Sequence, residues 1–342
     1  MSVTIRSRAP LRLAFGGGGT DVSPYANERG GLVLNATINR FAYVTLRPND
    51  TGRVTLRSLD YDEDLTFSAA DGVPSNAGAM TLACGVLRRL GLLEDDPSQG
   101  FDLFTHTDCP PGSGLGASST MVVALIGAFE AWRRRGLDRY EVARLAYSIE
   151  REDLGMQGGK QDQYAAAFGG FNFMEFERDR VLVNPLRIPD ETIFELEYAL
   201  ILAYTGRSRV SSQILEQQIQ NFKAGAVDSV AGMDRTKALA VEMKRALLTG
   251  DLGGFGSVLD EAWQAKKAMA KAISNPQIES IYAAAREAGA LGGKVSGAGG
   301  GGFMFFFSDF GRRHAVIEAI RQHGAEPVHF GFTGRGLETW VR

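Results

Sequence analysis

The residues best suited to chemistry stand in a glycine-rich segment at 110–120, Pro-Pro-Gly-Ser-Gly-Leu-Gly-Ala-Ser-Ser-Thr. Alternating glycines let successive backbone N–H groups turn toward an anion, because no Cβ stands in the way. A strand pattern precedes the segment at 101–107, and a helical pattern follows at 118–135. The start of that helix adds unpaired N–H donors and the positive end of its dipole, so we predict a phosphate-binding loop.

An ordinary capped turn is the alternative, but it needs one glycine and one serine rather than three glycines and a Ser-Ser-Thr run. The segment lacks the Gly-Lys-Ser/Thr ending of a Walker A loop and the partner motifs of a protein kinase. We expect ATP contacts from nine consecutive residues, namely Pro111, Gly112, Ser113, Gly114, Leu115, Gly116, Ala117, Ser118 and Ser119.

A second glycine-rich segment, at 294–303, lies in the C-terminal half. It contains the letters of a Rossmann GxGxxG, but a strand pattern follows at 303–307, where a Rossmann fold has a helix. A wide hairpin turn would also explain it. We interpret it as a wall of the nucleotide or substrate site, with Gly299 and Gly300 as substrate contacts.

Two acids are candidates for phosphoryl transfer, which needs a metal-neutralised nucleotide and a group that accepts the hydroxyl proton. Glu150 stands near the end of a helical pattern at 140–154, where a solvated helix end is the simpler interpretation. Asp162 follows Gly158 and Gly159 in what we interpret as a glycine-flanked turn. Residue types alone leave a surface role open for both acids.

Three separated motifs resemble those of the GHMP kinases, a family that includes galactokinase and mevalonate kinase. They are Ala-Pro-Leu-Arg at 9–12 with the glycine run at 16–19, the loop at 110–120 and the segment at 294–303. The resemblance covers the whole chain. It implies an α+β, two-domain fold: an ATP-binding N-terminal domain (1–190) like ribosomal protein S5 domain 2, and a ferredoxin-like C-terminal domain (191–342). The active site would lie between them.

The resemblance also assigns roles. Asp162 would be the catalytic base, and Arg12 would stabilise the charge of Asp162 and of the transition state. Glu150 and Ser118 would bind Mg²⁺. Family loops usually read Gly-Leu-Gly-Ser-Ser, whereas Ala117 takes the place of the first serine here, so a one-residue shift would make Ser119 the ligand.

The substrate side is indicated by the glycine run and the Thr-Asp pair at 20–21, where galactokinases carry Gly-Glu-His-Thr-Asp. Together with Asn-Ala-Thr-Ile at 35–38 and Gly-Gly-Phe-Asn-Phe at 169–173, it most resembles the heptose 7-phosphate kinases of this family. That group phosphorylates the anomeric C1 hydroxyl, giving the 1,7-bisphosphate for nucleotide-activated heptose. We expect substrate contacts from Gly18, Gly19, Thr20, Asp21, Lys160 and Arg207, with Arg40 and Arg209 as further cations for the sugar phosphate.

Three alternatives remain. One is another sugar-1-kinase, similar to fucokinase or galactokinase. The second is a catalytically silent metabolite sensor, which the presence of Glu150 and Asp162 argues against. The third resembles diphosphomevalonate decarboxylase, against which Thr20-Asp21 and Asp162-Gln163 argue.

Composition narrows the partners. Thirty-seven Lys and Arg against 40 Asp and Glu give a net charge of −3, which disfavours nucleic acid. The N-terminus lacks the apolar stretch of a signal peptide, and no apolar run is long enough to span a bilayer. We expect a cytoplasmic enzyme that binds a sugar phosphate and MgATP without a membrane, with a homodimer as the candidate assembly.

Proline and periodicity place the domain boundary. Pro185 and Pro189 interrupt the pattern, so we set the boundary near Asp190. Beyond it we predict a strand at 195–204, four helices between 211 and 288, and a last strand at 328–333.

Overall fold

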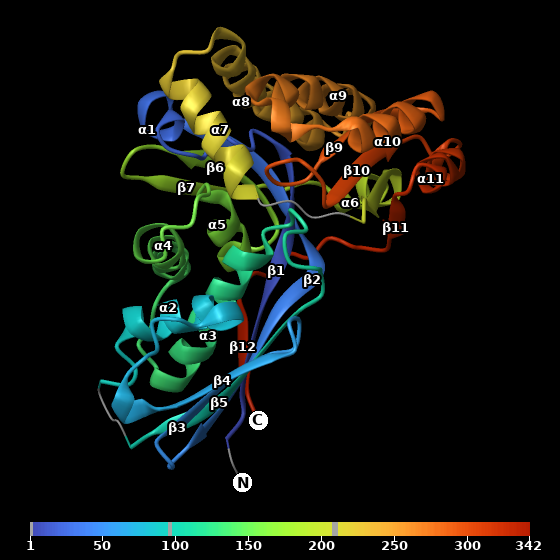
Figure 1. Cartoon of the computed structure of the whole chain (residues 1–342). Coiled ribbons are helices and arrows are strands. Elements are labelled where there is room, and N and C mark those ends of the chain that lie inside the picture. Colours follow the sequence, from blue (N-terminus) through green and yellow to red (C-terminus); the bar gives the residue numbers. More distant parts are fainter. Residues whose placement is uncertain (1–2, 95–97, 207–210) are drawn as a thin grey trace.

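The computed structural model describes residues 3–94, 98–206 and 211–342. Within these residues, an eight-stranded sheet has the order β12-β1-β2-β5-β3-β4, and β6 pairs with β2 and β7 (Figure 1). Its strands are β1 (Ile5–Gly16), β2 (Gly31–Asn49), β3 (Arg53–Ser58), β4 (Glu63–Ser68), β5 (Gly100–Thr107), β6 (Phe171–Phe176), β7 (Val181–Pro185) and β12 (Glu338–Val341).

Helices cover one face of this sheet (Figure 1). They are α2 (Thr81–Leu90), α3 (Ala117–Arg133), α4 (Arg139–Ser148) and α5 (Gln161–Phe168). The short turns η1 (Ala69–Asp71) and η2 (Gly78–Met80) precede α2, and the π-helical η3 (Ile149–Asp153) lies between α4 and α5. Helix α3 is buried all round from Ser119 to Phe129 and packs on β1 and β2. Its nearly unbroken apolar sequence therefore belongs to a central helix, and its first turn is held rigidly above β1.

A smaller antiparallel sheet organises the second half, in the order β11-β8-β10-β9. Its strands are β8 (Leu200–Tyr204), β9 (Ala290–Val295), β10 (Phe303–Ser308) and β11 (Glu326–Val328). Helices α1 (Tyr25–Arg29), α6 (Asp190–Ala199), α7 (Ser211–Lys223), α8 (Val227–Thr249), α9 (Leu252–Met269), α10 (Pro276–Glu287) and α11 (Arg313–Gln322), with η4 (Lys271–Ile273), complete the chain. Helices α8 and α9 also contact β1, so the two halves share an interface.

The predicted α+β class is confirmed, and three local predictions are wrong. Residues 195–199 belong to helix α6, because Pro189 and the acids after it start a helix that buries Leu196 and Ala199. The predicted strand at 328–333 ends at Val328 as β11. Asp162 lies in the first turn of α5 rather than in a turn between glycines.

The last strand, β12, was not predicted. It pairs antiparallel with β1, from Ile5↔Val341 to Arg8↔Glu338, so the C-terminus returns to the first sheet. The domain boundary near residue 190 stays a prediction, and it cannot apply to β12, which belongs to the first sheet.

Candidate active site

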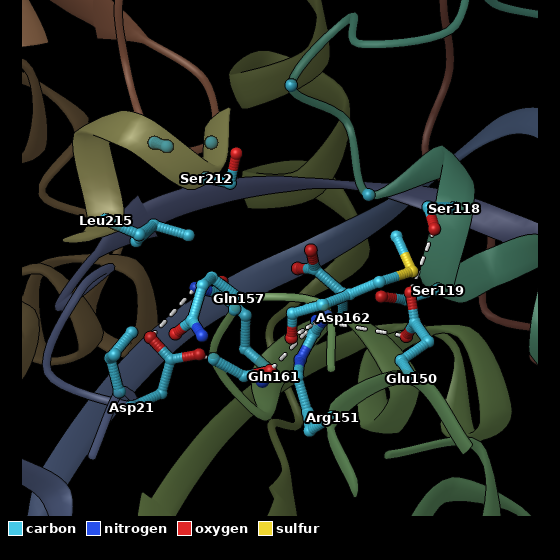
Figure 2. Close-up of a pocket in the computed structure, with 18 of the residues that line it drawn as sticks. Asp21, Ser118, Ser119, Glu150, Arg151, Gln157, Gln161, Asp162, Ser212 and Leu215 are labelled. Carbon is cyan, nitrogen blue, oxygen red and sulfur yellow. Dashed lines mark hydrogen bonds and ion pairs between the residues drawn. The ribbon is translucent and has the colours of Figure 1, made fainter. Parts of the chain in front are cut away.

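A cavity of about 530 Å³ lies where the two halves meet (Figure 2). Strand β1, the loop before α3, η3, α5, α7, α9 and the second glycine segment all contribute to its wall. Asp21 and Gln161 occupy one side, Ser118 and Glu150 the other, and Asp162 stands between them. The cavity therefore has two sides, called here the sugar side (Asp21, Gln161) and the phosphate side (112–119, Glu150).

The phosphate side is built from backbone. Gly112, Gly114 and Gly116 have φ of 73°, 81° and 82°, in the left-handed region that favours glycine. Gly116 precedes α3 without a side-chain cap, and Gly116, Ala117, Ser118 and Ser119 line the cavity. Uncapped N–H groups at a helix start that open onto a cavity can bind an anion such as phosphate.

The second glycine segment supports this loop from behind. Phe303 N donates to Ser113 O over 2.9 Å. A Cβ on Gly114 would lie 2.6 Å from Ser296 O, and one on Gly297 would lie 2.6 Å from Gly114 O. The two segments thus need glycine because their backbones touch.

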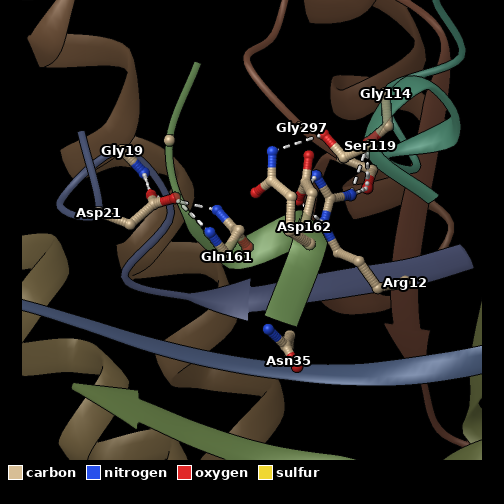
Figure 3. A network of polar contacts seen from close by, with 12 residues as sticks. Arg12, Gly19, Asp21, Asn35, Gly114, Ser119, Gln161, Asp162 and Gly297 are labelled. Atoms are coloured by element: carbon tan, nitrogen blue, oxygen red, sulfur yellow. Dashed lines mark hydrogen bonds and ion pairs between the residues drawn. The ribbon is translucent and has the colours of Figure 1, made fainter. Parts of the chain in front are cut away.

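Arg12 joins this support to Asp162 (Figure 3). Its Nε and Nη2 both lie 2.7 Å from Asp162 Oδ1, and its Nη1 donates to Gly114 O over 2.7 Å. The guanidinium is almost completely buried, whereas the Asp162 side chain keeps 22% of its surface exposed toward the cavity. A fixed cation beside a reachable carboxylate suits a base that accepts a proton from a bound hydroxyl.

Glu150 is fully buried in the π-helical turn η3, and such turns are common at functional sites. Ser118 Oγ donates to its Oε1 over 2.9 Å, while Gln163 Nε2 donates to its Oε2. Gln163 also donates to Ser119 Oγ over 3.0 Å. A carboxylate and a hydroxyl fit the oxygen ligands that Mg²⁺ takes when nucleotide phosphates supply the others. Among the described residues no group of three or more His, Cys, Asp or Glu could hold a metal alone.

The sugar side centres on Asp21, which is 1% exposed. Its carboxylate accepts from Gly19 N (3.1 Å), Gln161 N (3.0 Å) and Gln161 Nε2 (3.2 Å). Burial raises the pKa of Asp21. Gln218 of α7 donates to Gly19 O over 3.0 Å, which fixes the loop that carries Asp21.

The structure brings many of the predicted residues to the cavity wall. They are Arg12, Gly19, Asp21, Gly112, Ser113, Gly114, Gly116, Ala117, Ser118, Ser119, Glu150 and Asp162.

Other predicted residues lie behind the wall or away from it. Thr20 donates to Gly17 O over 2.7 Å, and Leu115 belongs to the apolar core. Lys160 donates to two backbone carbonyls at 177 and 178, each over 3.5 Å. Gly18 and Gly299 are buried off the wall, Gly300 donates to Ile273 O, and Pro111 is exposed. Arg40 donates to His329 O on the surface; Arg207 and Arg209 lie outside the described residues.

Gln161, Gln218 and Lys266 are among the cavity residues that carried no predicted role. Lys266 is 4% exposed on α9 and donates to Gly297 O. Burial lowers the pKa of Lys266 to about 8. The available signal was weak: α9 is amphipathic, and Lys266 falls on its buried face with Leu259, Ala262 and Trp263.

Comparison with known proteins decides the family. The model described as the GHMP kinases N terminal domain matches residues 80–170, and the GHMP kinases C terminal model matches 243–326. A D-glycero-alpha-D-manno-heptose 7-phosphate kinase of Campylobacter jejuni is 41% identical, over 98% of this chain and 99% of its own. The chain belongs to the GHMP kinase family. The predicted resemblance and the GHMP kinase fold are thereby confirmed.

Solved structures of GHMP kinases agree. The crystal structure of a D-glycero-D-manno-heptose 1-phosphate kinase from Bacteroides thetaiotaomicron aligns with a TM-score of 0.82 and 38% identity, covering 98% of both chains. Lactococcus lactis galactokinase aligns with a TM-score of 0.77 at 17% identity, covering 98% of this chain and 95% of its own, which supports the fold alone.

This GHMP kinase is therefore a sugar kinase, a phosphotransferase with an alcohol group as acceptor, and ATP is the phosphate donor in its family. Within the described residues, every helix is too short or too polar to traverse a bilayer.

Proposed function

We propose that this GHMP kinase transfers the γ-phosphoryl group of ATP to the anomeric C1 hydroxyl of D-glycero-D-manno-heptose 7-phosphate, giving the 1,7-bisphosphate. The observation that carries the reaction type is the Arg12–Asp162 pair, which stands between the phosphate side and the sugar side of one cavity. An acceptor hydroxyl held by the sugar side would lie between the base and the phosphoryl donor.

In the proposed phosphoryl transfer, one bond forms, one bond breaks and one proton moves to a residue of this chain. The C1 oxygen forms a bond to the γ-phosphorus, and the bond from that phosphorus to the β,γ-bridging oxygen breaks to release ADP. The hydroxyl proton passes to the Asp162 carboxylate. Arg12, fixed by Gly114 O, offsets negative charge beside the reacting atoms.

Ser118 and Glu150 would hold Mg²⁺, since their oxygens already lie 2.9 Å apart. Ser118 suits this role better than Ser119, whose hydroxyl accepts from Gln163 and is 3% exposed. The ion would neutralise charge on the nucleotide phosphates.

The choice of sugar rests on the relatives. One is named for heptose 7-phosphate and another for heptose 1-phosphate. The first name supports an acceptor that already carries the 7-phosphate, whereas the second names a 1-phosphate, so the two names agree on a heptose phosphate and differ in the position. The competing sugar is fucose, because the L-fucokinase/L-fucose-1-P guanylyltransferase of Bacteroides fragilis is 28% identical over 87% of this chain, although only 34% of that relative is covered.

The experiment is an assay of ADP release with MgATP and, separately, heptose 7-phosphate, unphosphorylated heptose, fucose, galactose or mevalonate. We expect turnover with heptose 7-phosphate alone and its loss in Asp162→Ala. Phosphorus NMR of the product would place the new phosphate at C1. Turnover with another sugar, or a phosphate on another carbon, would overturn the substrate assignment.

A further inference from the structure

Lys266 brings a charge from the second half of the chain into the reaction centre. It lies on α9, where it is 4% exposed and lines the cavity. Its Nζ donates to Gly297 O. A Cβ on Gly18 would lie 3.9 Å from this Nζ and 3.7 Å from Gln161 Nε2. The ammonium is therefore anchored between the second glycine segment and the sugar side.

The charged groups that face Lys266 come from four different segments. Asp21 and Asp162 favour its charged form, while Arg12 disfavours it. Lys294 on β9 is fully buried nearby and donates to Phe15 O over 3.0 Å. Within the described residues, no carboxylate lies within ion-pair distance of Lys266 Nζ, so its charge is balanced only from a distance.

A buried ammonium group whose N–H donors lack partners destabilises the folded protein unless a bound ligand accepts hydrogen bonds from them. Lysine has three N–H donors, and in the described part of the chain one hydrogen bond, to Gly297 O, is formed. Removing an unpaired charge from water carries a large penalty. Since the side chain lines the cavity, the remaining donors can be satisfied by an anion bound there.

The hydrogen bond from Lys266 to Gly297 O indicates which anion this lysine binds. Gly297 packs directly on Gly114 of the phosphate loop. The hydrogen bond to Gly297 O therefore holds Lys266 next to that loop. Asp162, the base of the proposed reaction, lines the same cavity and favours the charged form of Lys266. We propose that Lys266 binds the phosphoryl group in transit, first as the γ-phosphoryl of ATP and then as the phosphate on the sugar product. This rests on the proposed phosphoryl transfer but not on which sugar accepts.

The test compares two nucleotides that differ in the γ-phosphoryl group, with no sugar present. Calorimetry would measure binding of MgAMPPNP and MgADP to the wild type, Lys266→Met and Lys267→Met. Lys267 is the matched control, because it follows on the same helix, pairs with Glu279 over 3.2 Å and does not line this cavity. We expect Lys266→Met to weaken MgAMPPNP about 10- to 100-fold and MgADP by roughly twofold or less, with the control unchanged.

Equal losses for both nucleotides, or none for either, would overturn the proposal. So would a rise in the sugar KM alone, which would instead make Lys266 a ligand of the sugar. Failure of the proposed function looks different: the wild type would bind neither nucleotide, or would turn over none of the sugars.

Lys266→Arg and the wild type keep the proposal testable if the methionine variant does not fold. Because burial lowers the pKa of Lys266 to about 8, the wild-type preference for MgAMPPNP over MgADP should fall as the pH rises through this value. The arginine variant keeps its charge and should keep its preference. A wild-type preference that is flat up to pH about 10, where an ordinary lysine also loses its proton, would contradict the proposal.

Discussion

The two sides of the cavity are built in opposite ways. Apart from Glu150, the phosphate side takes eight consecutive positions, 112–119, and presents backbone N–H groups from a glycine loop and a helix start. The sugar side takes single side chains from distant segments: Asp21 after β1, Gln161 in α5 and Gln218 in α7. One side depends on the absence of side chains, and the other on their polar ends.

This difference sets how each side should respond to mutation. Added side-chain atoms should weaken nucleotide binding on the phosphate side, because the two backbones there are too close to leave room for a Cβ. Lost hydrogen-bonding groups should harm the sugar side, where each side chain holds its neighbour. Asp162 stands where the two sides meet, so its loss should affect the reaction itself.

The largest effect is expected at Asp162. Asp162→Asn keeps the shape of the side chain but removes the proton acceptor, so kcat should fall about 10²- to 10⁴-fold. MgAMPPNP affinity and the KM for sugar should change little, because neither side of the cavity is altered. Steady-state kinetics with calorimetry would check this, and a kcat above a tenth of wild type would show that Asp162 is not the base.

The next effect tests the phosphate side by adding one carbon. In Gly114→Ala the new Cβ would lie 2.6 Å from Ser296 O, so the loop must move and kcat/KM for ATP should fall about 100-fold. Gly136→Ala is the matched control: its φ of 80° is almost the same as the 81° of Gly114, but nothing lies within 4 Å of its Cβ.

Both variants carry the cost of a left-handed alanine, so comparing them isolates the close backbone contact. Thermal unfolding of both, beside their ATP kinetics, separates strain from loss of binding. If Gly136→Ala slowed the reaction as much as Gly114→Ala, the contact between the two glycine segments would be irrelevant to nucleotide binding.

The same contrast explains what the sequence could reveal. A glycine pattern is local, so the loop at 110–120 and its helix could be predicted from neighbouring letters. Asp21, Gln161 and Gln218 meet only after folding. A family motif marked Asp21, whereas no motif marked Gln161 or Gln218. Lys266 belongs to no motif, and only the packing of α9 buries it.

The errors in the fold have the same origin. Residues 195–198 alternate acidic with apolar or aromatic types, which also suits a strand, and the helix is decided by its start at Pro189 and by burial of Leu196. Strand β12 is short and mostly exposed, and it is a strand because β1 offers it an open edge. Neither cause is visible in a short window of sequence.

A smaller effect is expected for Asp21→Asn. The amide would place N–H donors against Gln161, whose own N–H groups now donate to the carboxylate, so the KM for sugar should rise about tenfold while the KM for ATP stays constant. Burial raises the pKa of Asp21, so in the wild type the sugar KM should begin to rise at a higher pH on acidification than an exposed carboxylate would cause. That rise of the sugar KM at acidic pH should be absent from the asparagine variant. If the KM for ATP changed together with the sugar KM, the two sides of the cavity would not act independently.

The smallest effect defines where the sugar side ends. Lys160 was expected to hold the substrate phosphate, yet its Nζ donates to the carbonyls of Glu177 and Arg178 over 3.5 Å, behind the cavity wall. Burial lowers the pKa of Lys160, and the carboxylate of Asp21 acts in the opposite direction. We expect Lys160→Met to change the KM for heptose 7-phosphate by roughly twofold or less, as for a charge that contacts no ligand. A rise of about tenfold that spares the unphosphorylated sugar would instead extend the sugar side past Gln161 to include Lys160.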